Sequence, residues 1–355
     1  MLMRPVGPVL AEEHNLLFFN QVCSTFEQEI KLKGCCKRTI AIGPVSLDLC
    51  FAGEEGLFQK IWPSIFHLEQ NQSMPAKFSI CCWDTQSTSP PPPPWGNEEI
   101  LSKGRILRFM NGPIRANVQA WTGIFSLMNM DTGQALYWVR DARQLPLFEE
   151  AAPFRHILHS FLKKSRLQFL HAAAIGTERG AILLAGRGGS GKSTTSLQAL
   201  ENGSLFLGDD YVATSTEKPF SVFSLYGTGK IAKSQAWRVP AISSLCPEAP
   251  LTEEGKYIYS IASTFPDSLR RELPLLAILL PQICKASSSR ILPVNQSEAL
   301  KALAPSTIFQ LAETDESDMA NISNLVRNLP VYRLELAEEG KQNIDAISLL
   351  LEDLQ

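Results

Sequence analysis

The chain has 355 residues, of which 45% are hydrophobic and 19% are charged, and this ordinary globular composition excludes a wholly disordered protein. The length predicts two or three domains. The formal net charge of −3, from 33 basic and 36 acidic residues, argues against a dedicated nucleic-acid-binding protein, whose surface is usually basic.

The sequence predicts neither a membrane-spanning segment nor a secretory signal. The longest apolar stretch, residues 273–283, contains Pro274 and Pro281. It is shorter than the roughly 18–20 residues of a membrane helix and indicates a buried strand. The N-terminal segment carries Pro5, Pro8 and two glutamates where a signal peptide has an apolar core. We therefore expect a cytoplasmic protein that does not bind membranes.

The eight cysteines do not suggest a metal site. None belongs to a CxxC pair, and the vicinal pairs at 35–36 and 81–82 have poor geometry for zinc. Cysteines of cytoplasmic proteins are normally kept reduced. We therefore expect free, mostly buried thiols.

Residues 1–150 predict a smaller, β-rich N-terminal domain of unknown role. Apolar and polar residues alternate over 45–51, which is typical of a half-buried strand, and residues 78–83 predict a second strand. An Asp-Thr-Gly turn at 131–133 lies between two apolar runs and predicts a β-hairpin.

Residues 87–97 contain five consecutive prolines, which exclude a regular helix or a central strand. We expect an exposed, polyproline-like loop. A docking motif for a proline-recognising protein is the alternative interpretation.

From residue 153 the pattern changes to that of an α/β domain, which we place at 151–355. Apolar residues at helical spacing, followed by basic ones, predict a helix over about 153–166. Residues 170–175 and 181–185 predict two buried strands joined by a glycine-containing turn.

A phosphate-binding motif follows the second of these strands. Residues 186–193 match the P-loop pattern GxxxxGK[ST], and a helix is expected directly after them. The glycines let backbone N–H groups surround phosphates, the lysine reaches the β- and γ-phosphates, and the next hydroxyl can bind Mg²⁺. The residues expected to bind the nucleotide are Gly186, Arg187, Gly188, Gly189, Ser190, Gly191, Lys192, Ser193 and Thr194.

Two aspartates and a histidine extend this candidate site. The short strand predicted at 205–207 is followed by Asp209 and Asp210, at the end of a strand where carboxylates face a phosphate site. One carboxylate can hold Mg²⁺ and the other can act as general base on an acceptor hydroxyl, and the motif does not distinguish them. His171, on the strand before the P-loop strand, is either a core histidine or part of this site.

The segments LHAAAIG, AILLAGRGGSGKST and LFLGDDY, in this order and spacing, resemble the catalytic domain of HPr kinase/phosphorylase. They are especially similar to its shorter relatives, serine kinases found beside peptide-biosynthesis genes, among them lasso-peptide kinases. The resemblance covers roughly residues 153–355, with weaker similarity at 226–231, 253–261, 298–311 and 329–336.

The resemblance implies a P-loop α/β kinase domain, related to phosphoenolpyruvate carboxykinase, that transfers the γ-phosphoryl group of ATP to a serine hydroxyl. It implies that Asp209 is the base toward the serine, that Asp210 lies on the metal side with Ser193, and that His171 lies near the transferred phosphoryl group. Lys230 falls in a segment whose lysine approaches the phosphates or the substrate. For Lys230 and Lys256, an ordinary surface position is an equal alternative.

Two features depart from the bifunctional enzyme of that family. The loop near the C-terminus that resembles its phosphorolysis element is not found, and residues 1–150 do not match its N-terminal domain. We therefore expect neither the reverse reaction nor HPr as the substrate.

The sequence thus predicts a kinase that uses ATP and Mg²⁺ to phosphorylate a serine in a peptide or small protein, with catalytic roles for Asp209, His171 and Lys192. One alternative is a small-molecule kinase on the same scaffold. Another is a non-catalytic module in which ATP switches the conformation of the N-terminal domain. Relatives are often oligomeric, so a homo-oligomer is compatible with the sequence.

Overall fold

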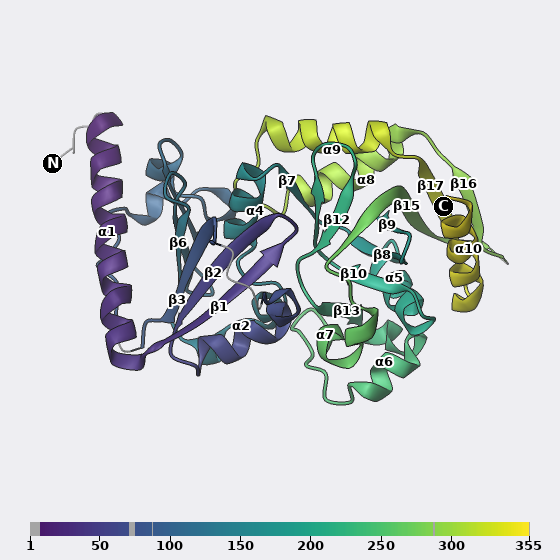
Figure 1. Ribbon diagram of the computed structural model, residues 1–355, viewed down its shortest axis with the longest axis horizontal. Helices are drawn as coiled ribbons and strands as arrows, with labels where there is room; N and C mark the ends of the chain where they lie inside the picture. Colours follow the sequence, from purple (N-terminus) through teal and green to yellow (C-terminus); the bar gives the residue numbers. More distant parts are fainter. Residues whose placement is uncertain (1–7, 71–74, 87, 287, 355) are drawn as a thin grey trace.

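Two large β-sheets lie side by side in a mixed α/β structure (Figure 1). The computed structural model describes residues 8–70, 75–86, 88–286 and 288–354. Residues 1–7, part of the segment predicted not to be a signal peptide, and Ser87, in the predicted proline-rich loop, lie outside the described residues. The domain division predicted at residue 150 stays a prediction.

Within the described residues, the first sheet has six strands in the order β1-β2-β3-β6-β5-β4. Their bounds are β1 (Cys35–Ile42), β2 (Val45–Ala52), β3 (Phe78–Asp84), β4 (Ile114–Gln119), β5 (Ile124–Asn129) and β6 (Gln134–Val139). β2, β3 and β6 are parallel, whereas the outer pairs are antiparallel. The strands predicted at 45–51 and 78–83 and the hairpin at 131–133 are confirmed, and Gly133 supplies the left-handed φ of 71° in that turn.

A long helix that the sequence patterns did not predict, α1 (Pro8–Lys33), covers one face of this sheet (Figure 1). Successive side chains of a strand point to opposite faces. In β3, Trp83 therefore packs with Phe26 of α1 on one face of the sheet. Ile80 and Cys82 of the same strand point the other way and join the core on the opposite face. The N-terminal part is thus a sheet buried on both faces.

Within the described residues, the second sheet has nine strands, with the main order β10-β8-β9-β15-β12-β11-β7 and with β17 and β16 beyond β15. Their bounds are β7 (Leu167–Leu170), β8 (Ala173–Thr177), β9 (Gly180–Leu184), β10 (Leu205–Gly208), β11 (Val212–Ser215), β12 (Ser221–Ser224), β15 (Glu272–Ala286), β16 (Arg290–Pro293) and β17 (Val331–Ala337). The strand predicted at 170–175 is split between β7 and β8, and His171 lies in the bend between them. A separate two-stranded antiparallel sheet is formed by β13 (Thr228–Ala232) and β14 (Lys256–Ser260). We call this pair of strands the β13–β14 hairpin, although residues 233–255 lie between them.

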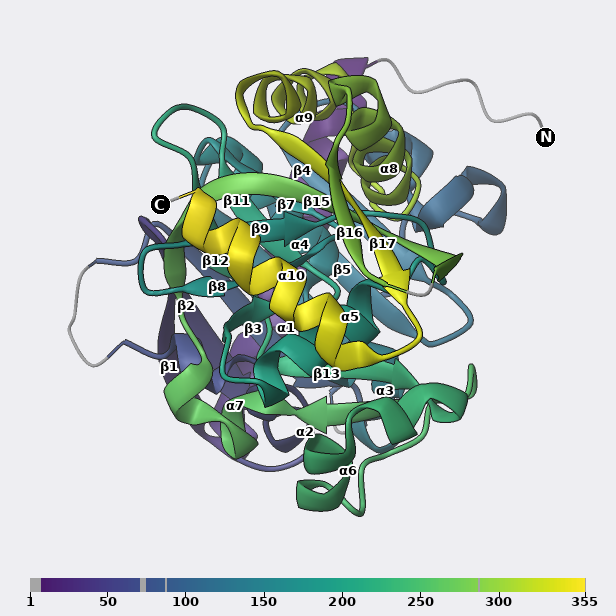
Figure 2. The same ribbon diagram turned by 90° about the vertical axis from the view of Figure 1, so that its right-hand side faces the viewer.

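Helices cover both faces of the second sheet (Figure 2). The longer ones are α4 (Arg155–Lys164), α5 (Lys192–Glu201), α8 (Gln296–Ile308), α9 (Glu316–Asn328) and α10 (Gly340–Asp353). One hydrophobic cluster contains side chains of α5 and α10, and another contains side chains of α8 and α9. Short helices are α2 (Leu57–Ile65), α3 (Leu147–Ala151), α6 (Pro240–Leu245) and α7 (Ile261–Thr264), with the 3₁₀ turns η1 (Phe66–Leu68), η2 (Asn97–Glu99), η3 (Ser102–Gly104), η4 (Leu107–Phe109), η5 (Ala142–Gln144), η6 (Lys233–Arg238) and η7 (Pro266–Ser268).

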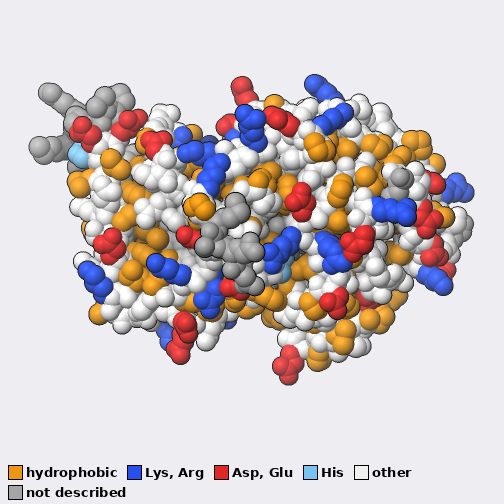
Figure 3. Space-filling view, viewed as in Figure 1, with side chains coloured by type: hydrophobic (Ala, Val, Ile, Leu, Met, Phe, Trp, Pro, Cys, Tyr) orange, Lys and Arg blue, Asp and Glu red, His pale blue; other side chains and the backbone are white. Residues whose placement is uncertain are grey.

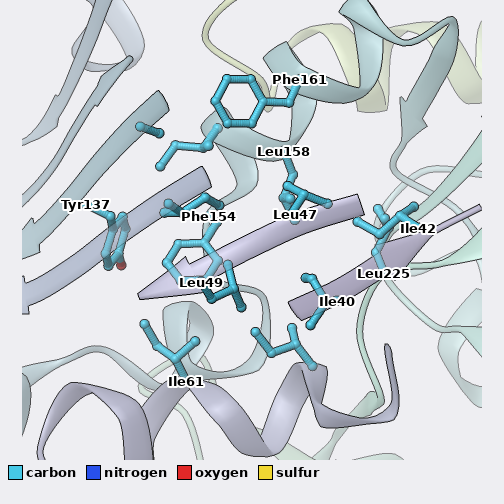
Figure 4. Close-up of a cluster of buried hydrophobic side chains, with 14 of the residues drawn as sticks. Ile40, Ile42, Leu47, Leu49, Ile61, Tyr137, Phe154, Leu158, Phe161 and Leu225 are labelled. Atoms are coloured by element: carbon cyan, nitrogen blue, oxygen red, sulfur yellow. The ribbon is translucent and has the colours of Figure 1, made fainter. Parts of the chain in front are cut away.

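One hydrophobic core joins the two sheets (Figure 4). Leu47 and Leu49 of β2 lie in the same buried cluster as Leu225, which follows β12 of the second sheet. Phe78 of β3 stacks on Phe161 of α4 with ring centroids 4.3 Å apart. The sheets are therefore held against each other by buried apolar contacts.

The structure corrects the prediction that all thiols are reduced, because Cys35 and Cys50 form a disulfide. The β1–β2 register pairs Cys50 with Lys37 and thereby brings the Cα atoms of the two cysteines to 6.2 Å. This pairing depends on the hairpin register, which a separation of 15 residues does not reveal. The free cysteines among the described residues are Cys23, Cys36, Cys81, Cys82, Cys246 and Cys284.

The charge distribution on the surface and the conformation of the proline-rich segment agree with the sequence analysis. Basic and acidic side chains are interspersed on the face shown in Figure 3. Residues 88–96 form neither helix nor strand, which confirms the predicted loop, and Trp95 packs edge-on against Phe18 of α1. Among the described residues, no helix combines the length and apolar character needed to cross a bilayer.

Candidate active site at one edge of the second sheet

The strand order brings three separate segments to one edge of the second sheet. β9 and β10 both pair antiparallel with β8, which lies between them, so β9 and β10 run in the same direction. The P-loop follows β9, Asp209 follows β10, and His171 precedes β8. Because the ends of β9 and β10 and the start of β8 meet at the same edge, the predicted site residues converge there.

The P-loop backbone has the form that an anion site needs. Gly191 precedes α5 with φ 102°, and a Cβ there would lie 2.6 Å from Leu336 Cδ1. A Cβ at Gly186 would lie 2.5 Å from Ser190 Oγ. The first turn of α5 has no capping side chain and no acidic residue. Its N–H groups and its positive dipole end are therefore available to phosphate oxygens.

Lys192 is only 7% exposed and folds back over the loop. Its Nζ donates to Gly186 O at 2.6 Å and to Arg187 O at 3.3 Å. Burial lowers the pKa of Lys192, and the carboxylates of Asp209 and Asp210 oppose that shift. The Oγ of Ser190 is buried without a hydrogen-bond partner. A phosphate group in this loop would give both side chains an anionic acceptor.

Asp209 belongs to the P-loop side of the site. It is 2% exposed, and its two oxygens accept from Ser196 Oγ on α5 at 2.9 Å and from the backbone N–H of Lys230 at 2.8 Å. Burial and the neighbouring Asp210 raise its pKa, whereas hydrogen bonds from Lys230, Ser196 and Ser193 act to lower it. Asp209 is thus fixed beside the first turn of α5.

Asp210 points instead toward a histidine and a lysine. Its Oδ1 lies 2.8 Å from His171 Nε2, its Oδ2 lies 3.0 Å from Lys230 Nζ, and its side chain is 32% exposed. Burial alone would raise the pKa of Asp210, but Lys230 and His171 hold it well below its usual range. Asp210 is therefore an ionised carboxylate with access to solvent.

Thr307, Tyr211 and the two aspartates hold His171 and Lys230 in place. The backbone N–H of His171 donates to Thr307 Oγ1 of α8 at 3.1 Å, and the ring of Tyr211 lies 5.2 Å from the imidazole. Lys230 contacts Asp209 through its backbone and Asp210 through its side chain. Lys230 thereby fixes the relative positions of the two carboxylates.

The structure brings some of the predicted site residues together and leaves others exposed. Lys192, Ser193, Asp209, Asp210, His171 and Lys230 come together, with the remaining P-loop residues around them. Arg187, Gly188 and Gly189 are exposed on the loop. Lys256, the first residue of β14, is exposed and forms an ion pair with Glu254 at 3.4 Å. Its charge nevertheless contributes to the lowered pKa of Lys192.

Sequence reasoning gave no role to Ser196, Tyr211 or Thr307, although Tyr211 ends the LFLGDDY motif. Ser196 lies one helical turn after Ser193, and this spacing could have placed both hydroxyls on the helix face toward Asp209. Thr307 is 136 residues from His171 in the sequence, and nothing in the local pattern links the two.

The residues fit ATP together with Mg²⁺. In phosphate-transfer sites Mg²⁺ usually takes one or two protein carboxylates together with phosphate oxygens, and Ser193 and the aspartates offer such ligands beside the loop. The unpartnered Ser190 Oγ and the uncapped start of α5 supply donors for the phosphates. In the described parts of the chain, no three His, Cys, Asp or Glu side chains gather so as to hold a metal ion by themselves.

Comparison with known proteins gives little similarity. No family model matches the sequence, and no curated protein matches it. Among solved structures, the HPr(Ser) kinase/phosphatase from Coxiella burnetii is similar to 53% of this chain over 97% of its own length, with 11% identity and a TM-score of 0.30. A TM-score this low carries no weight for activity, so the site geometry has to support any function.

Proposed function

We propose that the protein is a phosphotransferase that moves the γ-phosphoryl group of ATP to a hydroxyl group. The observation that carries this proposal is the convergence of Lys192 and the uncapped start of α5 with the pair Asp209 and Asp210. Phosphoryl transfer depends mainly on positioning and on neutralising charge. Cationic donors and N–H groups would bind the phosphates, and a solvent-accessible carboxylate beside them would orient the acceptor.

We further propose a division of labour between the two aspartates, which exchanges the roles that the family resemblance implies. Asp209 is buried, and its partner Ser196 and its neighbour Ser193 both belong to α5, so it suits the metal side. Mg²⁺ bound there with ATP would neutralise charge on the β- and γ-phosphates. Asp210 is more exposed and suits an acceptor hydroxyl, which it would orient as a hydrogen-bond acceptor. Because its lowered pKa makes it a weak base, it would take the hydroxyl proton only late in the transfer, once the bond to phosphorus has formed and the hydroxyl has become acidic.

His171 and Lys230 would act around the transferred group. Lys230 holds Asp210 ionised and in place at 3.0 Å. The Nδ1 of His171 is buried without a partner, while its Nε2 contacts Asp210. On this proposal, His171 orients the carboxylate, and the acceptor is a serine hydroxyl of a peptide or small protein, as the sequence motifs suggest.

A phosphotransfer assay tests the proposal. The full chain is incubated with Mg²⁺, γ-labelled ATP and a size-fractionated lysate, in parallel with Asp209→Asn, Asp210→Asn and the exposed-site control Glu217→Gln. We expect acid-stable label in a peptide or protein fraction with the wild type and the control. Asp210→Asn should lose transfer but keep nucleotide binding, whereas Asp209→Asn should also weaken the response to Mg²⁺.

Several results would contradict parts of this proposal. Label confined to small molecules would favour a small-molecule kinase. Tight ATP binding without transfer to any fraction would favour a nucleotide-gated module. Full transfer by Asp210→Asn, with loss only in Asp209→Asn, would restore the roles that the resemblance implies.

A further inference from the structure

The β13–β14 hairpin presents one continuous face from the candidate active site to the N-terminal part. Register pairs Thr228 with Ser260, Lys230 with Ile258 and Ala232 with Lys256, so these side chains share a face. The opposite face packs on α5, because a Cβ at Gly229 would lie 2.7 Å from Leu197 Cδ2. The face that carries Lys230 is therefore turned away from α5.

The far end of this face borders a crevice of about 150 Å³ between the hairpin and helices α2 and α3. Thr228, Ile258 and Ser260 line it from the hairpin, and Leu147 and Ala151 line it from α3. All three hairpin residues belong to the face that carries Lys230. The crevice and Lys230, whose Nζ contacts Asp210, thus lie along the same face of the two strands.

Close contacts build this crevice into the fold. The N–H of Gly227 donates to Ser64 O of α2 at 2.7 Å, and Thr228 Oγ1 donates to Ala151 O of α3 at 2.9 Å. A Cβ at Gly227 would lie 2.5 Å from Ala262 Cβ, so no larger residue fits there. Figure 1 shows α2, α7 and β13 side by side at this junction.

Size and charge indicate what the crevice accepts. A cavity of about 150 Å³ holds a group the size of a benzene ring, which corresponds to one side chain. Its two charged lining residues among those described, Lys60 and Glu150, form an ion pair at 2.9 Å. With these charges paired and with apolar side chains such as Leu147 and Ile258 in the wall, the crevice suits an uncharged, apolar side chain.

We propose that the crevice binds an apolar side chain of an extended peptide acceptor, two residues from the serine that is phosphorylated. This inference rests on the proposed phosphotransferase function. Thr228 and Lys230 are two residues apart on β13, a spacing of about 6.6 Å that equals the repeat between same-side residues of an extended peptide. A serine hydroxyl at Asp210 would then place the side chain two residues away at Thr228 and Ser260. The N-terminal part would supply one wall of the acceptor site through α2 and α3.

A serine-centred positional peptide library, with Mg²⁺ and γ-labelled ATP, tests this inference on the full chain. We expect roughly tenfold preference for Leu, Ile, Val, Met or Phe over Gly or Asp at one position two residues from the serine, which is typical of a hydrophobic pocket. Ser260→Phe, which fills the crevice, should abolish the preference and raise KM for the preferred peptide roughly tenfold. Hydrolysis of ATP without peptide should not change.

Control variants separate the crevice from general effects of substitution. Ser244→Phe on α6 places the same aromatic ring at an exposed serine outside the crevice and should leave the preference intact. Leu147→Ala enlarges the crevice and should shift the preference toward larger aromatic residues, which gives a second readout if Ser260→Phe does not fold.

The outcomes distinguish this inference from the proposed function. Peptide phosphorylation with no preference at either position, or a preference unchanged in both Ser260→Phe and Leu147→Ala, would overturn the crevice assignment and leave the kinase proposal standing. Phosphate transfer to small molecules but to no peptide would also overturn it. A wild-type protein that neither transfers nor hydrolyses the γ-phosphate would overturn the proposed function itself.

Discussion

Three glycines of the P-loop should respond very differently to the same substitution by alanine. Gly188 has no left-handed φ, and no atom lies within 4 Å of the position that a Cβ would take there, whereas Gly189 has φ 79° in open space. Gly191 combines φ 102° with a contact of 2.6 Å to Leu336 Cδ1. Left-handed backbone costs a non-glycine residue about 1–2 kcal/mol. Overpacking adds only about 1 kcal/mol at Gly191, because the atom in contact is the terminal methyl group of the flexible Leu336 side chain, which can shift.

The free energy of unfolding should therefore fall by about 2–3 kcal/mol in Gly191→Ala and by about 1–2 kcal/mol in Gly189→Ala. Gly188→Ala should be neutral or more stable by about 0.4–1 kcal/mol, because alanine reduces the entropy of the unfolded chain. Urea unfolding of the three variants at one pH measures this order. Since Gly191 is the residue directly before α5, its alanine variant should also bind Mg-ATP roughly tenfold to a hundredfold more weakly.

The reasoning would be refuted if Gly191→Ala and Gly188→Ala unfolded at the same urea concentration. Unchanged Mg-ATP affinity in Gly191→Ala, measured by calorimetry, would separately refute the link between the start of α5 and the phosphates. Gly189→Ala serves as the internal control, because it carries the backbone strain without the contact to Leu336.

Three further predictions concern buried charges. Lys192→Ala should lose nucleotide affinity and about 10²–10³ in transfer rate, measured by calorimetry and phosphotransfer, and full activity would exclude the P-loop assignment. Ser196→Ala removes a hydrogen bond to the carboxylate of Asp209, so the pKa of Asp209 should rise further. The acidic limb of the profile of transfer rate against pH should then move to higher pH. An unmoved limb would exclude Asp209 as the group that must be ionised. Asp318→Ala should lower the free energy of unfolding by about 3 kcal/mol at pH 7, because it breaks a fully buried contact with His159. Burial acts to raise the pKa of Asp318, but its hydrogen-bond partners hold that pKa low in the folded state. The stabilisation that Asp318 contributes is therefore lost as the pH falls toward the lowered pKa. The urea midpoints of the variant and the wild type should converge at acidic pH.

Local patterns predicted the elements of the fold where one physical signal dominated. The alternation over 45–51, the glycine turn at 131–133 and the helix predicted directly after the glycine-rich motif all appear as expected. The helix α1 was missed because its apolar residues do not form a clean stripe, and Leu16 and Leu17 remain about half exposed. The shared core of the two sheets could not be predicted, because it depends on contacts such as that of Phe78 with Phe161, 83 residues further along (161 − 78).

The two aspartates show most clearly what a motif can and cannot specify. Their position after a short strand predicted that both would reach the phosphate site, because that follows from strand direction alone. Which carboxylate turns toward α5 depends on Lys230, whose backbone N–H and Nζ bind different aspartates from one position of β13. Since Lys230 lies 20 residues beyond Asp210, only the folded hairpin can assign the buried carboxylate to Asp209 and the accessible one to Asp210. The same hairpin also contacts α3 through Thr228, so the part of the chain that orients Asp210 is the part that the N-terminal helices touch.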